Sequence, residues 1–399
     1  MYGVAWRRQA RRKLSLESGA KAIPRLSQAR VYDPVAMDSH TEQARAFFLE
    51  GLAHYQAGRL PQAEQQFTAA LALVPGRPSV LTNLGAVRLK LGRAEEALAL
   101  LQEALAQEPD NAEALGHCGT ALAELGKPAE ALALFDRALQ QDPGQAAVWT
   151  LRGSVLKELG QPEEAASSFQ EALARGGDPE LHRYYLAGLA RTEAPRAAPA
   201  HYVQSLFDAY AADFDGHLVQ ALAYQAPRLL TEPLLASGRR YAHALDLGCG
   251  TGLCGPYLRR LAARLTGVDL SANMLDKAQA LGVYDTLLQA EAGAWLAAAQ
   301  ERFDLVIAAD VFIYVGALDE VFGQLARLMP PGGTFCFTVE ASDGQDLVLR
   351  RSLRYAHSEA YLRQLADTHG FRVVNLRKST VREDQRVPIP GLFVWMERA

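Results

Sequence analysis

Residues 242–254 read AHALDLGCGTGLC, and this stretch decides the fold of the C-terminal half of the chain. The apolar run 242–247 predicts a buried strand, and the glycines at 248, 250 and 252 predict a tight loop directly after it. The amphipathic segment 253–264 then predicts a helix. Strand, glycine loop and helix in this order are typical of a parallel sheet with helices on both faces.

The alternation of strands and helices continues to the C-terminus. The second strand ends at Asp269, and Ser271 is a good N-cap for a helix over 272–280. We predict further strands at 265–268, 286–289, 303–309 and 334–340, a helix at 357–369, and a closing antiparallel pair at 371–377 and 392–398. The C-terminal half is therefore predicted to be an α/β domain.

The spacing of the glycines distinguishes between nucleotide ligands. A dinucleotide fingerprint is G-x-G-x-x-G, whereas this loop reads G-x-G-x-G with Asp246 two positions before the first glycine. Asp246 would repel a pyrophosphate but would accept hydrogen bonds from an ammonium group. S-adenosylmethionine has an ammonium group, a ribose and no phosphate, and Asp269 at the end of the second strand is placed to accept from both ribose hydroxyls.

Residues 241–399 resemble the class I S-adenosylmethionine-dependent methyltransferases. Besides the loop, the turn LMPPGG at 328–333 matches the proline-glycine turn of that family. The resemblance implies a Rossmann-like domain with a seven-stranded, mostly parallel sheet. It also implies that Glu291 hydrogen-bonds the adenine amino group, although aspartate is commoner there, and that Asp310 lies at the mouth where the methyl group is transferred.

Two groups of candidate site residues follow. The predicted cofactor-binding residues are Asp246, Gly248, Gly250, Gly252, Asp269, Leu270, Glu291 and Asp310. Candidates for covering the cofactor or contacting the acceptor are Tyr210, Phe214, Tyr314 and His357, with Asp310 as the candidate catalytic residue. Alternatives stay open for three of them, because Tyr210 and Phe214 also fit a buried helical stripe and His357 fits a structural position at a helix start. The four cysteines form no C-x-x-C pair, so no metal site is predicted.

The N-terminal half contains a repeat. Glycines recur every 34 residues at 51, 85, 119 and 153, and again at 58, 92, 126 and 160. Alanines follow at fixed offsets in each unit, with an aromatic residue or leucine between them. This pattern resembles the tetratricopeptide repeat, in which paired helices stack into a solenoid with a concave groove. We predict four repeats over 43–177 and a capping helix over 180–191.

These segments give a domain plan. We predict a basic, disordered head at 1–40, repeats at 41–191, a Pro/Ala-rich linker at 192–200, a helical cap at 201–240 and the methyltransferase core at 241–399. Residues 1–36 hold eight Lys or Arg against two acidic residues, and translation starting at Met37 is an alternative explanation of this head.

Charge and hydropathy exclude some partners. The formal net charge is −4, which does not favour nucleic acid, and no apolar run is long enough to span a bilayer. The arrangement resembles a bacterial group of predicted repeat-containing methyltransferases. The resemblance implies an enzyme that uses S-adenosylmethionine but no particular substrate. The few cysteines and the lack of a secretory signal predict a cytoplasmic protein. We expect the methyl acceptor to be a protein partner bound in the repeat groove, because docking there would raise its effective concentration at the catalytic domain. The alternatives are a non-catalytic adaptor, and a small-molecule methyltransferase whose repeats are a scaffold.

Overall fold

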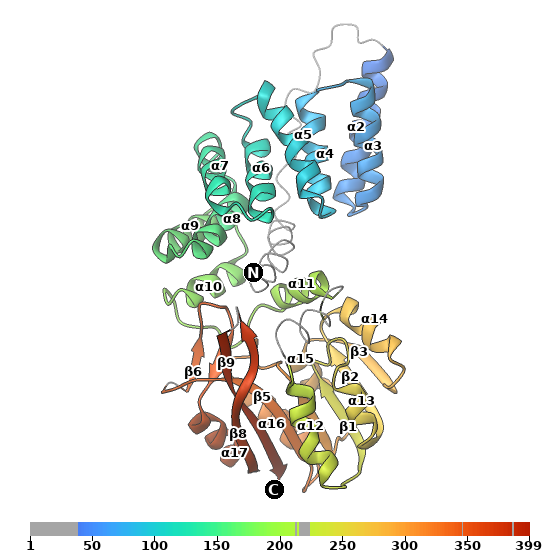
Figure 1. Cartoon of the computed structure of the whole chain (residues 1–399), viewed down its shortest axis with the longest axis vertical. Helices are drawn as coiled ribbons and strands as arrows, with labels where there is room; N and C mark the ends of the chain where they lie inside the picture. Colours follow the sequence, from blue (N-terminus) through green and yellow to red (C-terminus); the bar gives the residue numbers. More distant parts are fainter. Residues whose placement is uncertain (1–38, 212–213, 215–223, 345, 385–386) are drawn as a thin grey trace. The chain divides into compact units, whose positions relative to one another are not determined.

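The computed structural model describes residues 39–211, 214, 224–344, 346–384 and 387–399. The chain divides into two compact units, with the boundary in the sequence between His182 and Arg183. The head predicted at 1–40 lies outside the described residues apart from its last two positions. Each unit is described separately below (Figure 1).

The first unit consists of stacked helix pairs (Figure 1). The pairs are α2 (Ser39–Gln56) with α3 (Leu60–Leu73), α4 (Pro78–Lys90) with α5 (Ala94–Gln107), α6 (Ala112–Glu124) with α7 (Pro128–Gln141), and α8 (Ala146–Glu158) with α9 (Pro162–Ala174). Four pairs at a spacing of 34 residues confirm the predicted tetratricopeptide architecture.

The first glycine of each repeat permits close packing of the two helices. A Cβ at Gly119 would lie 2.6 Å from the ring of Phe135, which is fully buried. Gly51, Gly85 and Gly153 lie in the same way against Phe67, Leu101 and Phe169. The glycines of the second series have φ between 73° and 78°, a left-handed conformation that ends the first helix of each pair.

The boundary between the units falls inside a helix rather than after it. Helix α10 (Pro179–Gly188) corresponds to the predicted capping helix, but the second unit already begins at Arg183. Within that unit, the Tyr184 hydroxyl donates to the Leu353 carbonyl oxygen at 2.6 Å, and Gly188 packs closely against Leu353. Part of the predicted linker at 192–200 also belongs to the fold of this unit, because Ala197 forms a β-bridge with Val315.

The second unit is built on one sheet. Its strands are β1 (Tyr241–Leu247), β2 (Ala262–Asp269), β3 (Thr286–Gln289), β4 (Leu305–Ala308), β5 (Thr334–Ala341), β6 (Leu347–Leu349), β7 (Tyr355–His357), β8 (Phe371–Asp384) and β9 (Val387–Arg398). The parallel order is β3-β2-β1-β4-β5, and β9 joins β5 antiparallel with β8 beside it. The sheet has nine strands rather than the predicted seven, because the short pair β6 and β7 joins the end of β5.

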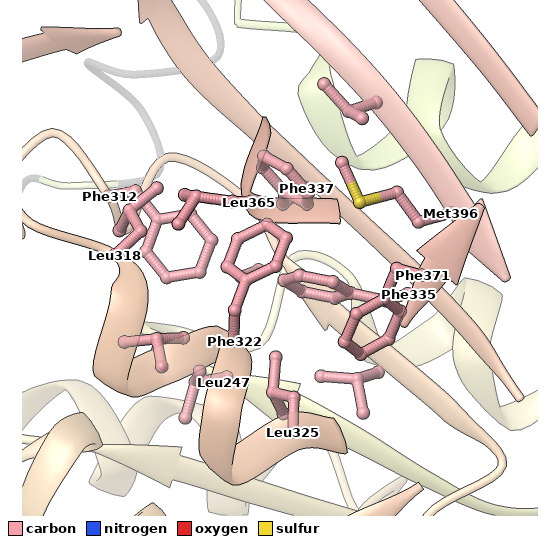
Figure 2. Packing of buried hydrophobic residues seen from close by; sticks show 14 of the residues in the cluster. Leu247, Phe312, Leu318, Phe322, Leu325, Phe335, Phe337, Leu365, Phe371 and Met396 are labelled. Carbon is pink, nitrogen blue, oxygen red and sulfur yellow. The ribbon is translucent and has the colours of Figure 1, made fainter. Parts of the chain in front are cut away.

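Helices cover both faces of this sheet. Helices α15 (Ala292–Ala298), α16 (Asp319–Leu328) and α17 (Glu359–His369) enclose a core rich in phenylalanine, in which Phe322 lies among Phe335, Phe337 and Phe371 (Figure 2). Helices α12 (Ala226–Ala236) and α13 (Gly255–Arg259) pack on the other face. Helices α11 (Ala200–Tyr210) and α14 (Ala272–Ala280) complete the described helices.

Three predicted boundaries need correction. The helix predicted at 253–264 is the short α13, and β2 begins at Ala262. His357 does not start a helix but is the last residue of β7, where it pairs with Ala341. Ser358 is the N-cap of α17, since its hydroxyl accepts from the Tyr361 N–H at 3.0 Å.

The glycine–phenylalanine contacts make a prediction about the repeats. We expect Gly119→Ala to destabilise them by about 1–3 kcal/mol, because the new methyl group overpacks the buried Phe135 ring. Hydrogen exchange of α6 and α7 in the full chain, measured by mass spectrometry, should then be faster. In the control Gly323→Ala on α16, the nearest neighbour is His369 at an ordinary 3.6 Å, so exchange in α16 should slow or stay unchanged. Unchanged exchange at α6 in Gly119→Ala would contradict this packing.

Candidate functional site

The glycine loop connects β1 to α13 at the carboxyl end of the parallel strands. Gly248, Gly250 and Gly252 have φ of 66°, 54° and 88°, which other residues rarely adopt. A Cβ at Gly248 would also overlap the side chain of Val311, which is the third residue after the end of β4. The loop therefore approaches the β4 end closely and exposes its backbone to the space between these strands.

Asp269 connects this loop to the end of β2. One carboxylate oxygen accepts from the Gly250 N–H at 2.8 Å, and the other accepts from the Ser271 N–H at 2.9 Å. Burial raises the pKa of Asp269, and these backbone hydrogen bonds oppose the rise. Since a carboxylate has about four acceptor positions, Asp269 keeps capacity to accept from a ligand such as a ribose hydroxyl.

Asp246 is buried at the end of β1, with 1% of its surface exposed. The Tyr284 hydroxyl donates to Asp246 Oδ2 at 2.7 Å. Burial raises the Asp246 pKa to about 7, whereas this hydrogen bond lowers it. A cationic group beside Asp246 would favour the ionised form of the carboxylate.

Tyr284 occupies a slot lined by glycines. A Cβ at Gly252 would lie 3.1 Å from its ring, and one at Gly255 or Gly267 would lie 2.9 Å from it. The slot fixes the ring and thereby aims the hydroxyl at Asp246. Nothing in the glycine-loop motif points to Tyr284, because Tyr284 follows Asp246 by 38 residues in the sequence.

Glu291 follows β3 and caps α15. Its oxygens accept from the Gly293 N–H at 2.9 Å and the Ala294 N–H at 2.6 Å. The side chain also lies at the cavity described next. Its contact with adenine stays a prediction.

One cavity of about 180 Å³ joins these groups within the second unit. Of the predicted residues, its lining includes Asp246, Gly248, Gly250, Asp269, Leu270, Glu291, Asp310, Tyr210, Phe214 and Tyr314. Gly252 is not in the lining and packs against Leu281 and Tyr284. The loop, the ends of three strands and the helical cap thus line one cavity.

His357 does not belong to this lining. It is buried, its Nε2 lies 2.7 Å from the Gly316 carbonyl oxygen, and its ring stacks on Tyr361. Burial lowers the His357 pKa to about 4. These contacts fit the structural alternative rather than a role at the acceptor.

Asp310 follows β4 with a φ of 62°, a strained conformation for a residue with a side chain. Its N–H donates to the Thr338 hydroxyl at 2.8 Å, which holds this backbone in place. Both carboxylate oxygens accept from Arg382 Nη1 at 2.7 Å. Asp310 therefore lies in the cavity wall as predicted, but its carboxylate is ion-paired. Sequence reasoning missed Arg382, which is 72 residues away in β8.

Aromatic residues of the cap also line the cavity. The Tyr210 and Phe214 rings are 5.1 Å apart, and Phe207 contacts Tyr314 edge to face with centroids at 5.6 Å. Helix α11 is tied to the start of α14, because the Ser271 hydroxyl donates to Asp208 at 2.5 Å. The cavity lining thus combines polar groups of the loop and strand ends with aromatic side chains of the cap.

Comparisons with known proteins agree with this description. A family model described as "Methyltransferase domain" matches residues 245–337. A tetratricopeptide repeat model matches 54–116, 88–155 and 122–191, and a second one matches 7–78. The second unit contains a class I S-adenosylmethionine-dependent methyltransferase domain. Tetratricopeptide repeats precede this domain in the sequence.

Several curated relatives match the second half of the chain. A malonyl-[acyl-carrier protein] O-methyltransferase of Enterobacter lignolyticus is 36% identical over 26% of this chain and 41% of its own length. Methyltransferase-like protein 27 of Homo sapiens is 34% identical over 37% of this chain and 64% of its own length. A trans-aconitate 2-methyltransferase of Paracidovorax citrulli is 31% identical over 30% of this chain and 46% of its own length. The chain spans roughly half the length of the curated relatives it matches.

Solved structures also match. The 1,6-didemethyltoxoflavin-N1-methyltransferase of Burkholderia thailandensis is 23% identical, with a TM-score of 0.40 over 52% of this chain and 93% of that one.

Among the described residues, no group of side chains could hold a metal ion, and no helix has the length and apolar character needed to cross a membrane.

The polar residues that line the cavity suit S-adenosylmethionine. Asp246 would face the ammonium group, Asp269 would accept from the ribose hydroxyls, and the backbone of the glycine loop would lie against the ligand. The bound cofactor supplies a methyl group on a sulfonium, which is already activated for transfer.

The first site prediction concerns Asp269. We expect Asp269→Ala to weaken S-adenosylhomocysteine binding by about 1–3 kcal/mol, because two ribose hydroxyls lose a buried acceptor. Isothermal titration calorimetry would measure this, with NAD as a ligand that should not bind. An unchanged affinity would remove Asp269 from the ribose site.

The second site prediction concerns Tyr284. Because the ionised form of Asp246 would attract the ammonium group, we expect affinity for S-adenosylhomocysteine to rise with pH as Asp246 deprotonates near pH 7. Tyr284→Phe removes a hydrogen bond that lowers this pKa, so the rise should move to higher pH. Tyr257→Phe on α13, outside the cavity lining, is the control and should keep the wild-type profile. Coincident profiles for Tyr284→Phe and wild type would show that Tyr284 does not tune Asp246.

Proposed function

We propose that the protein transfers a methyl group from S-adenosylmethionine to an oxygen of an acceptor that a partner protein presents. The observation that carries this proposal is one cavity, whose lining combines the carboxylates of Asp246 and Asp269 with aromatic side chains and two arginines. The oxygen acceptor is supported by relatives named as malonyl-[acyl-carrier protein] and ubiquinone biosynthesis O-methyltransferases.

The protein contributes geometry and exclusion of water. A sulfonium methyl group needs a nucleophile aligned behind it, and orientation alone lowers the barrier by several kcal/mol, roughly 7–11 in favourable cases. Tyr210, Phe214 and Tyr314 form the apolar wall that keeps water out. Asp310 holds Arg382 in this wall rather than presenting an unpaired carboxylate as a base.

The repeats support a protein-borne acceptor. Their stacked helices form the kind of groove that binds an extended peptide or a partner helix. Because repeats and catalytic domain share one chain, a docked partner would present its acceptor at up to millimolar effective concentration.

A free metabolite is the second candidate acceptor. A relative named as trans-aconitate 2-methyltransferase favours it, because that name specifies a small acid. In this case the repeats would be a scaffold or would recruit the enzyme to an assembly.

Tritiated cofactor distinguishes the two acceptors. Lysate of a strain lacking the gene is incubated with labelled S-adenosylmethionine and the full chain, and acid-precipitable label is separated from soluble label. We expect label in the precipitate. An excess of full-length Asp269→Ala should lower that label, because this variant keeps the repeats and occupies the partner without binding cofactor well.

Two results would contradict the proposal. Label only in small molecules, unaffected by the Asp269→Ala competitor, would favour the metabolite. No label at all despite tight binding of S-adenosylhomocysteine would favour a non-catalytic adaptor.

A further inference from the structure

The lining of the cavity includes two buried arginines. Arg354 precedes β7 and is 6% exposed, and Arg382 lies in β8 and is 2% exposed. Both line the same cavity as Asp246 and Asp269. Charged side chains are rarely buried this far unless they are paired or meet a ligand of opposite charge.

The network around these arginines holds them in fixed positions. Arg382 bonds both oxygens of Asp310 at 2.7 Å and also bonds Glu340. Arg350 donates to the other oxygen of Glu340 at 2.8 Å. Arg354 hydrogen-bonds Tyr314 and interacts electrostatically with Glu340 and Asp310. The site is therefore preorganised, and little side-chain entropy remains to be lost on binding.

The charges at this part of the cavity lining favour an anion. Among the described residues, the guanidinium groups of Arg354 and Arg382 line the cavity with the carboxylate of Asp310, whereas Arg350 and Glu340 are outside the lining. Interactions between charges are strong here, because the surroundings are apolar and largely shielded from water. The planar guanidinium group matches a carboxylate in a two-bonded geometry that an ammonium group cannot reproduce.

We propose that the methyl acceptor is a carboxylic acid whose carboxylate is bound by Arg354 and Arg382. This inference rests on the proposed function, since it assigns the chemical class of that acceptor. The carboxylate anchors the acceptor at the charged end of the wall, and the aromatic side chains of the cap contact its apolar part. Asp310 and Glu340 act as positioning residues, because they orient Arg382.

The experiment uses the full chain saturated with S-adenosylhomocysteine. The probes are 3-phenylpropionate, its neutral amide 3-phenylpropanamide, and inorganic phosphate, each titrated by calorimetry. We expect the carboxylate to bind at least tenfold more tightly than the amide, and phosphate to bind no better than the amide. This comparison uses the wild-type protein alone and does not depend on any variant folding.

Variants then assign the effect to Arg354. Arg354→Gln should remove the preference for carboxylate over amide, and Arg354→Lys should restore only part of it because the planar fork is lost. The matched control is Arg350→Gln. Arg350 bonds the same Glu340, but it is about a third exposed and does not line the cavity, so the preference should persist within twofold.

The outcomes separate this inference from the proposed function. Equal binding of carboxylate and amide to the wild-type protein, or a preference for phosphate, overturns the inference while methyl transfer stands. A loss of S-adenosylhomocysteine affinity in Arg354→Gln, with the probes unaffected, also overturns it by assigning Arg354 to the cofactor's own carboxylate. A wild-type protein that does not bind S-adenosylhomocysteine contradicts the proposed function itself.

Discussion

The Asp269 carboxylate accepts hydrogen bonds from the backbone N–H groups of Gly250 and Ser271, and the geometry of the cofactor end depends on this pair of bonds. These two hydrogen bonds connect the loop after β1 to the N-cap of α14, so one carboxylate holds the ends of β1 and β2 together. Ser271 in turn donates to Asp208 in α11, which fixes the helical cap to the same point. A change at Asp269 would therefore act on the loop, the helix start and the cap together.

The sequence predicts the parts of the site that are local in the chain. The glycine loop, Asp246, Asp269 and the N-cap Ser271 lie within 26 residues, and each has a conformational or chemical reason that a pattern exposes. The 34-residue period of the repeats is predictable for the same reason, because one helix pair sets the constraints for every other.

The remaining parts depend on tertiary contacts that no local pattern encodes. Tyr284 reaches Asp246 only because Gly255 and Gly267 leave room for its ring. Arg382 meets Asp310 through β8 and β9, a long antiparallel pair beyond the parallel sheet. The prediction that His357 starts a helix is wrong because the sequence pattern does not reveal the three-residue strands β6 and β7. Strand β7 pairs with β5 and ends at His357, so α17 starts only after it.

The burial of Asp246 links the stability of the domain to its ligand. Its folded-state pKa of about 7 lies above the ordinary value of 3.8, so the stability it contributes is present at acid pH and is lost as pH rises through 7. Near neutral pH, the ligand-free domain therefore carries the cost of a buried anion, and a cationic ligand offsets that cost. The empty domain would thus be least stable in the pH range in which the site binds its ligand most tightly.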